Sequence, residues 1–156
     1  MGGTELSARE VKYVAFDPGE TTGFAQFDPS GDLIRSGKIS VAGKPERLYQ
    51  ELPLAIPGTT RVVIIEDYEL FAHKAAAQSW SKLETVRYIG AIQYHAHLLK
   101  AEVVFQKPNV KPVAYMWAGI EVPKQKIMTH ETDAFVHGVY YLQKSGVRKP
   151  QQGRAQ

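Results

Sequence analysis

The sequence predicts an α/β fold: a five-stranded mixed sheet, made of an antiparallel meander and two parallel strands, flanked by helices. Three observations carry this prediction. Residues 11–39 hold three β-prone stretches joined by short turns, which is typical of a meander. Short apolar stretches at 61–65 and 102–105 each follow a segment of helical periodicity. Crossovers between strands of this kind are right-handed, so the later strands should run parallel to the first.

The first strand is expected over residues 11–17, a mostly apolar run that ends at Asp17. Pro18 and Gly19 then turn the chain, and an extended pattern resumes over 23–27. An ionised carboxylate at the end of a buried strand is costly unless a cation, hydrogen bonds or a metal ion compensates it. Asp17 is therefore either the cap of a tight turn or part of a functional site.

The next elements follow from alternation and then from helical spacing. A turn rich in Asp, Pro and Gly leads to a third strand over 33–39, where apolar and polar residues alternate. A short amphipathic helix is expected over 46–54, with its apolar side chains on one face. The stretch 61–65 is rich in β-branched residues, as in a strand buried on both faces, and it ends at a second acid, Glu66.

A long helix is expected from about residue 75 to residue 100, because apolar residues recur there at three- and four-residue spacing. These residues form two separate sets. One set comprises Trp80, Leu83, Val86, Gly90, Tyr94 and Leu98, and the other comprises Tyr88, Ile92, Ala96 and Leu99. One face should meet the sheet and the other something else, such as a second subunit.

The last strand is expected over 102–105. A helical piece is expected to open at 107–109 and to run through Lys111 to about Trp117, and the final helix should run from about Thr129 to Lys144.

The composition is that of a soluble globular protein, since 44% of the 156 residues are hydrophobic and 22% are charged. We expect one domain over 11–143, between a flexible N-terminus at 1–10 and a basic flexible tail at 144–156.

No apolar run approaches a membrane span and no secretion signal is apparent, so we expect a cytoplasmic protein without a membrane partner. The absence of cysteine excludes disulfides and thiolate zinc sites. A formal net charge of +3 permits a nucleic-acid partner without requiring one.

Acidic residues end two strands that can lie side by side. Asp17 and Glu66 would then meet at the carboxyl ends of these strands, where α/β sheets bind ligands. They would repel each other unless a cation lay between them. The last helix adds His130, Asp133 and His137 on one face, at three- and four-residue spacing. Oxygen ligands with an imidazole favour Mg²⁺ or Mn²⁺ over zinc, and phosphodiester hydrolysis with two ions is the matching chemistry.

Each of these residues also has a structural interpretation. Asp133 near a helix N-terminus can simply stabilise the helix dipole, and His130 can be a surface residue of the first turn. Four residues at the right element ends favour a metal site over four independent structural roles. These residues are Asp17, Glu66, His130 and Asp133.

Four short motifs occur in order along the chain. They are Asp17-Pro18-Gly19 with Thr22-Gly23, the strand-end Glu66, Pro-Asn-Val-Lys at 108–111, and His-x-x-Asp-Ala at 130–134. With the element order, this set resembles the RuvC family of Holliday-junction resolvases, in the RNase H-like nuclease superfamily. The resemblance covers most of residues 11–143. It implies an RNase H-like fold and a homodimeric, Mg²⁺-dependent crossover junction endodeoxyribonuclease. Such an enzyme resolves Holliday junctions and other branched DNA by paired nicking, in recombination, repair or phage DNA processing.

The resemblance also implies which residues act. Asp17, Glu66, His130 and Asp133 would form the catalytic, metal-binding centre. Lys111 would steady a backbone phosphate, and an aromatic residue after Glu66 would stack on bases near the crossover. For that aromatic residue we favour Phe71 over Tyr68. Further candidates for phosphate contacts are Lys107, Lys124 and Lys126.

Two features depart from the family pattern. The family usually has an acid where His130 stands, so His130 is a ligand, a water-activating base or neither. The segment from Gly119 to Met128 is shorter than in the bacterial enzymes. A chain trimmed in this way is similar to the phage-encoded relatives, which by analogy implies action in a host cytoplasm and on forks and flaps as well as junctions.

Three other function classes share part of this pattern. An actin- or sugar-kinase-like ATPase opens with a similar hairpin but needs two domains, and 156 residues cannot hold both. A non-catalytic RNase H-like nucleic-acid-binding module gains nothing from clustered carboxylates. A ribonuclease acting on RNA–DNA hybrids stays open on chemistry alone, although a long helix suited to a dimer favours a two-fold substrate.

Overall fold

The computed structural model describes residues 9–68, 80–122 and 129–149, except for the side chains of 80–83. Its elements are β1 (Tyr13–Asp17), β2 (Thr21–Phe27), β3 (Leu33–Ser40), α1 (Glu46–Ala55), β4 (Val62–Glu66), α2 (Trp80–Leu98), β5 (Glu102–Gln106), the 3₁₀ helix η2 (Pro108–Val110), α3 (Lys111–Ala118) and α4 (His130–Lys144). The order is the predicted one. β2 begins earlier than expected because Thr21 and Thr22 pair with the end of β3.

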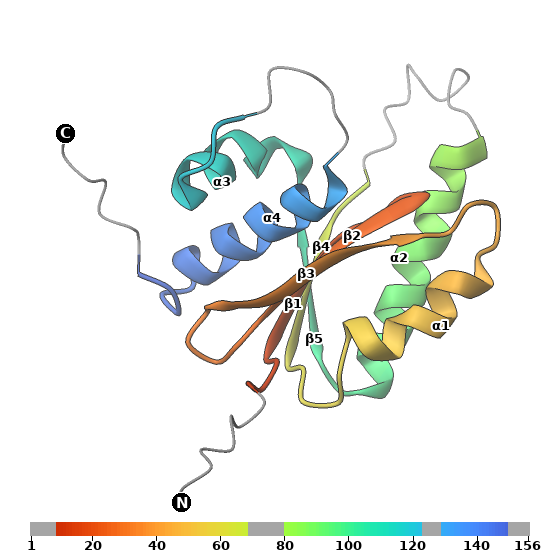
Figure 1. Cartoon of the computed structure of the whole chain (residues 1–156), viewed down its shortest axis with the longest axis horizontal. Helices are drawn as coiled ribbons and strands as arrows, with labels where there is room; N and C mark the ends of the chain where they lie inside the picture. Colours follow the sequence, from red (N-terminus) through yellow and green to blue (C-terminus); the bar gives the residue numbers. More distant parts are fainter. Residues whose placement is uncertain (1–8, 69–79, 123–128, 150–156) are drawn as a thin grey trace, which may run out of the picture.

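The five strands form one mixed sheet in the order β3-β2-β1-β4-β5 (Figure 1). β1, β2 and β3 are antiparallel neighbours, whereas β4 runs parallel to β1 and β5 runs parallel to β4. This arrangement confirms the predicted meander with two parallel strands.

Helices cover both faces of the sheet. α1 and α2 lie on one face, and α3 and α4 lie on the other (Figure 1). α4 approaches the sheet closely at Gly138, where an added Cβ would lie 2.3 Å from the ring of Phe27. Since real Cβ contacts are never this short, a side chain at residue 138 would push the helix away from the sheet.

The two apolar sets of α2 separate as expected. Tyr88, Ile92 and Ala96 are buried against the sheet. Val86, Tyr94 and Leu98 are 51%, 65% and 59% exposed. The face of α2 that carries Val86, Tyr94 and Leu98 is therefore an exposed apolar surface of this chain.

Residues at both ends of the described chain contact the domain. Arg9 donates a hydrogen bond from Nε to Asp28 Oδ2 at 3.1 Å. Beyond α4, the backbone N–H of Arg148 donates to the carbonyl of Leu142 at 2.9 Å. The flexible ends stay a prediction, because 1–8 and 150–156 lie outside the described residues. Within the described ranges, no helix is both long enough and apolar enough to cross a membrane.

Candidate active site

Asp17 and Glu66 lie side by side at the carboxyl ends of two parallel strands. Side chains alternate between the two faces of a sheet. Ala15 and Ile64 belong to the core beneath α4, so Asp17 and Glu66, two residues further along, point to that same face. The register pairs Phe16 with Ile65, which places the two acids next to each other. This juxtaposition confirms the prediction from the sequence.

The N-terminus of α4 brings the third acid to this point. It packs against β2 at Gly23, where an added Cβ would lie 1.9 Å from the carbonyl oxygen of His130. Only glycine permits this approach. The glycine of the Thr22-Gly23 motif is therefore explained by helix packing, because it lets the first turn of α4 carry His130 and Asp133 to Asp17.

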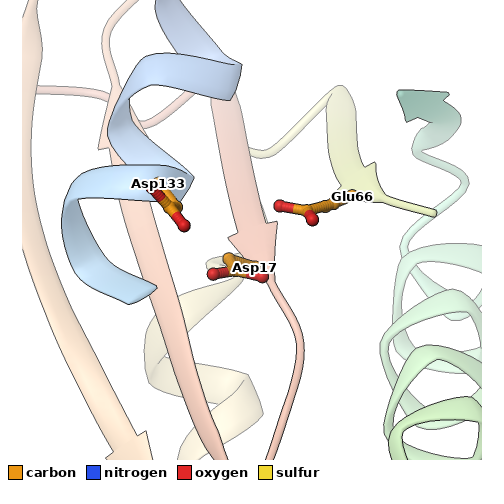
Figure 2. A group of neighbouring side chains, drawn as sticks. All are labelled: Asp17, Glu66 and Asp133. Carbon is orange, nitrogen blue, oxygen red and sulfur yellow. The ribbon is translucent and has the colours of Figure 1, made fainter. Parts of the chain in front are cut away.

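Three carboxylates converge at this corner of the fold (Figure 2). Asp17, Glu66 and Asp133 each offer an oxygen atom, and these atoms all lie within 4.8 Å of one another. The side chains are only 8%, 12% and 21% exposed. Such a set of hard oxygen donors suits Mg²⁺ or Mn²⁺. The residues present therefore fit a divalent cation.

His130 lies beside Asp17. Its Nδ1 atom is 2.7 Å from Asp17 Oδ2. This hydrogen bond raises the pKa of His130, although partial burial works against it. The group of three acids that fits a metal ion does not include the imidazole. The role of His130 as a ligand stays a prediction.

Lys111 reaches into the acid cluster from the first turn of α3. Its Nζ atom lies 2.9 Å from Asp133 Oδ2 and 3.0 Å from Glu66 Oε2. Burial lowers the pKa of Lys111, but the carboxylates of Glu66, Asp133 and Asp17 outweigh this effect and raise it overall. The family resemblance implies a phosphate contact for Lys111, which stays a prediction, and it does not imply these ion pairs.

Tyr115 lies one helical turn beyond Lys111 and donates a hydrogen bond from its hydroxyl to Asp133 Oδ1. Burial and this bond raise the pKa of Tyr115 to about 12. α3 therefore holds both oxygens of Asp133, one through Lys111 and one through Tyr115. The four-residue spacing of these two side chains indicates a shared face but does not identify its target.

The environments of Asp17 and Glu66 differ. Burial raises the pKa of Asp17, and the nearby charge of Glu66 adds to this effect against His130 and Lys111. Burial would also raise the pKa of Glu66, but hydrogen bonds and charge from His137 and Lys111 lower it overall. The surroundings therefore shift the two pKa values in opposite directions, upward for Asp17 and downward for Glu66.

His137 and Gln106 complete the surroundings of Glu66. His137 is fully buried, with Nε2 2.9 Å from Glu66 Oε2 and Nδ1 2.7 Å from Gln106 Oε1. Helical spacing predicts that His137 shares a face with His130 and Asp133 but gives it no role. No sequence pattern singles out Gln106.

The other predicted DNA contacts are only partly described. Lys107 is exposed between β5 and η2. Tyr68 is half-buried and packs against the core beneath α1 and α2. Phe71, Lys124 and Lys126 lie outside the described residues. All five stay predictions.

Comparison with solved structures identifies the fold. Thermus thermophilus RuvC in complex with a Holliday junction substrate matches with a TM-score of 0.63 and 18% identity, over 86% of this chain and 96% of that chain. A further Thermus thermophilus RuvC structure matches with a TM-score of 0.58 and 15% identity, over 86% and 96% of the two chains. No family model matches the sequence, and no curated protein matches it either. The chain has the RuvC type of RNase H-like fold, as its motifs and element order predicted.

Proposed function

We propose that this protein is a metal-dependent endonuclease that resolves Holliday junctions and other branched DNA by hydrolysing phosphodiesters. One observation carries the proposal: oxygen atoms of Asp17, Glu66 and Asp133 lie within 4.8 Å of one another. A group of acids held this closely needs positive charge. The fold supports the same function, because a RuvC with this fold forms a complex with a Holliday junction.

The proposed cofactor is Mg²⁺, with Mn²⁺ as the alternative, and two ions per active site. These ions would be held by the carboxylates of Asp17, Glu66 and Asp133. When bound, such ions make water a stronger nucleophile and stabilise negative charge on the scissile phosphate.

His130 is proposed to move a proton during cleavage. The hydrogen bond between Nδ1 and Asp17 fixes the ring. Its other nitrogen, Nε2, makes no hydrogen bond to a described residue. A histidine held in this way at the edge of a phosphate-cleaving site can accept a proton from the attacking water or give one to the leaving group.

Lys111 is proposed to stabilise the phosphate. It already lies among the acids, and a cation bound there would weaken its ion pairs with Glu66 and Asp133. Its ammonium group could then turn towards the scissile phosphate. Lys107, Lys124 and Lys126 would extend this contact along the backbone, and Phe71 or Tyr68 would stack on bases.

A homodimer would suit a substrate with two strands to cut. The exposed apolar residues of α2, Val86, Tyr94 and Leu98, are the proposed contact. Two active sites related by a two-fold axis would give the paired nicks. We place this activity in the cytoplasm, in DNA recombination, repair or phage DNA processing.

The test is cleavage by the full chain of an end-labelled four-way junction, a flap, an RNA–DNA hybrid and a linear duplex, each with Mg²⁺ or EDTA. We expect Mg²⁺-dependent nicks in the junction, placed symmetrically about the crossover. Asp17→Asn should abolish cleavage while gel-shift binding of the junction survives. Preferential cleavage of the hybrid would establish a ribonuclease instead. Cleavage by Asp17→Asn at the wild-type rate would rule out this site.

A further inference from the structure

A polar cluster lies behind the acids and shares Glu66 with them. Its centre is His137, on α4 one turn after Asp133. Its other members are Glu66 and Gln106, which are register partners at the ends of β4 and β5. The histidine bridges the two strand ends, with Nε2 2.9 Å from Glu66 and Nδ1 2.7 Å from Gln106.

The position of His137 is one that an apolar residue would normally fill. The residue is fully buried, and so are Val136 beside it and Val139 two residues further along α4. A buried polar side chain adds stability only when its hydrogen bonds are satisfied, and an apolar side chain of similar size often does as well. Simple packing is therefore a weak reason for a histidine here. Its two nitrogen atoms point instead at the end of the sheet that carries the acids.

The direction of the hydrogen bonds follows from the chemistry of the groups. An ionised Glu66 can only accept, so Nε2 of His137 carries the proton that the two share. The amide of Gln106 can accept from Nδ1 or donate to it, depending on which way it is turned. In either case Gln106 fixes the orientation of the ring. The chain Gln106–His137–Glu66 thus ends in a donor aimed at one carboxylate oxygen.

The same carboxylate oxygen of Glu66 also forms an ion pair with the ammonium group of Lys111. Oε2 of Glu66 lies 2.9 Å from His137 Nε2 and 3.0 Å from Lys111 Nζ. Oε1 accepts no hydrogen bond from a described residue. The two donors on one side therefore turn the carboxylate so that its other oxygen is available to a cation.

We propose that His137, backed by Gln106, is a positioning residue that holds Glu66 in the orientation in which it binds a divalent cation. This inference rests on the proposed metal-dependent function. It accounts for the orientation of Glu66, which α3 contacts through Lys111 alone. The other two acids have their own partners: His130 contacts Asp17, and Lys111 and Tyr115 contact both oxygens of Asp133. Residues behind a metal ligand commonly change metal affinity or activity by about 10- to 100-fold when they are replaced.

The test measures Mn²⁺ binding to the full chain without DNA, by electron paramagnetic resonance titration. His137→Leu keeps a similar volume and removes the donor, whereas His137→Gln can place an amide N–H near the position of Nε2. We expect His137→Leu to weaken Mn²⁺ binding by about 10- to 100-fold. His137→Gln should recover most of this loss. The Mg²⁺ concentration for half-maximal cleavage should rise in parallel, with junction binding in EDTA unchanged.

Two further variants keep the test decisive. His95→Leu removes a half-buried histidine that also makes a hydrogen bond, to Ile56 on the far face of the sheet, and should leave Mn²⁺ binding unchanged. Gln106→Leu leaves the imidazole in place and should weaken Mn²⁺ binding less than His137→Leu does. It also replaces that variant if His137→Leu does not fold. Nitrogen-15 NMR of the metal-free protein should show His137 protonated at Nε2, with a shift of this signal in Glu66→Gln.

The outcomes separate this inference from the proposed function. Wild-type Mn²⁺ affinity in His137→Leu, or in Gln106→Leu if that variant alone folds, would overturn the positioning role while leaving the nuclease intact. Equal loss in His137→Leu and His137→Gln would overturn it too, because a restored donor would then have no effect. A wild-type protein that neither binds Mn²⁺ nor cuts any branched DNA would instead remove the proposed function.

Discussion

Gly23 of β2 and His130 of α4 are in direct backbone contact. An added Cβ on Gly23 would lie 1.9 Å from the carbonyl oxygen of His130 and 2.5 Å from the amide nitrogen of Glu131. Neither atom belongs to a flexible side chain, so the helix itself would have to move. The position of the first turn of α4, and with it that of Asp133, depends on this glycine.

Gly23→Ala should therefore separate Asp133 from Asp17 and Glu66. We expect junction cleavage to fall by about 100-fold, because a shift of about 1 Å at a catalytic centre can cost this much. The free energy of unfolding should fall by about 1 to 3 kcal/mol from overpacking. Gly58→Ala is the matched control, since an added Cβ there meets nothing within 4 Å. Wild-type cleavage by Gly23→Ala would show that the helix position does not matter.

Lys111→Met should leave the repulsion between the carboxylates of Glu66 and Asp133 without a compensating positive charge from α3. Without Mg²⁺, we expect the free energy of unfolding to fall by about 1 to 3 kcal/mol, because two carboxylates lose a charged hydrogen-bond donor. Added Mg²⁺ should raise the melting temperature more than in the wild type, because the cation no longer competes with an ammonium group. Thermal unfolding with and without Mg²⁺ measures this, and the exposed Lys44→Met is the control. Equal Mg²⁺-induced shifts in variant and wild type would place the lysine outside the cation site.

His130→Asn distinguishes proton transfer from a purely structural role. The amide of asparagine can keep a hydrogen bond to Asp17 but cannot take up a proton. If His130 moves a proton, His130→Asn and His130→Ala should both cut junctions about 100- to 10,000-fold more slowly. Single-turnover cleavage is the measurement. If His130→Asp retains activity while both other variants lose it, residue 130 acts as a metal ligand. Wild-type rates in the alanine variant would leave it without a catalytic role.

The lowered pKa of Asp28 predicts that the free energy of unfolding falls in acid. Burial would raise its pKa, but hydrogen bonds from Ser30, the Asp32 backbone and Arg9 outweigh burial and lower it to about 2. Because the pKa in the folded state lies below the unfolded value of 3.8, the carboxylate stabilises the fold above about pH 4. That contribution is lost as the pH falls towards 2.

The measurement is urea unfolding of wild type and Asp28→Asn between pH 7 and pH 2. Asp28→Asn cannot be charged, so it should be less stable at pH 7 by about 1 to 2 kcal/mol. The difference between the two proteins should shrink towards pH 2. A constant difference across this range would show that the charge of Asp28 does not contribute.

Much of the fold could be predicted because strands and helices have different periods. Side chains of any strand point alternately to the two faces of its sheet, so the meeting of Asp17 and Glu66 follows from the sequence once β1 and β4 are paired. The two apolar sets of α2 were visible in the sequence. Which set is buried was not, since Ile92 and Tyr94 are both apolar and only packing places one inside and the other outside.

The surroundings of the acids could not be predicted in the same way. Contacts between Lys111 and Asp133 depend on how α3 packs against α4, and no local sequence pattern predicts the angle between these two helices. The pairing of His137 with Gln106 depends on the β4–β5 register and on the depth of α4 at the same time. A sequence shows a histidine at helical spacing from Asp133, but its partner on another strand becomes visible only in three dimensions.

The most direct test of the central claim is anomalous diffraction from crystals of the full chain grown with Mn²⁺. We expect anomalous density within ligand distance of the carboxylates of Asp17, Glu66 and Asp133, and its loss in Asp17→Asn. Mn²⁺ bound elsewhere, with these three carboxylates carrying none, would contradict the metal-dependent nuclease proposed here.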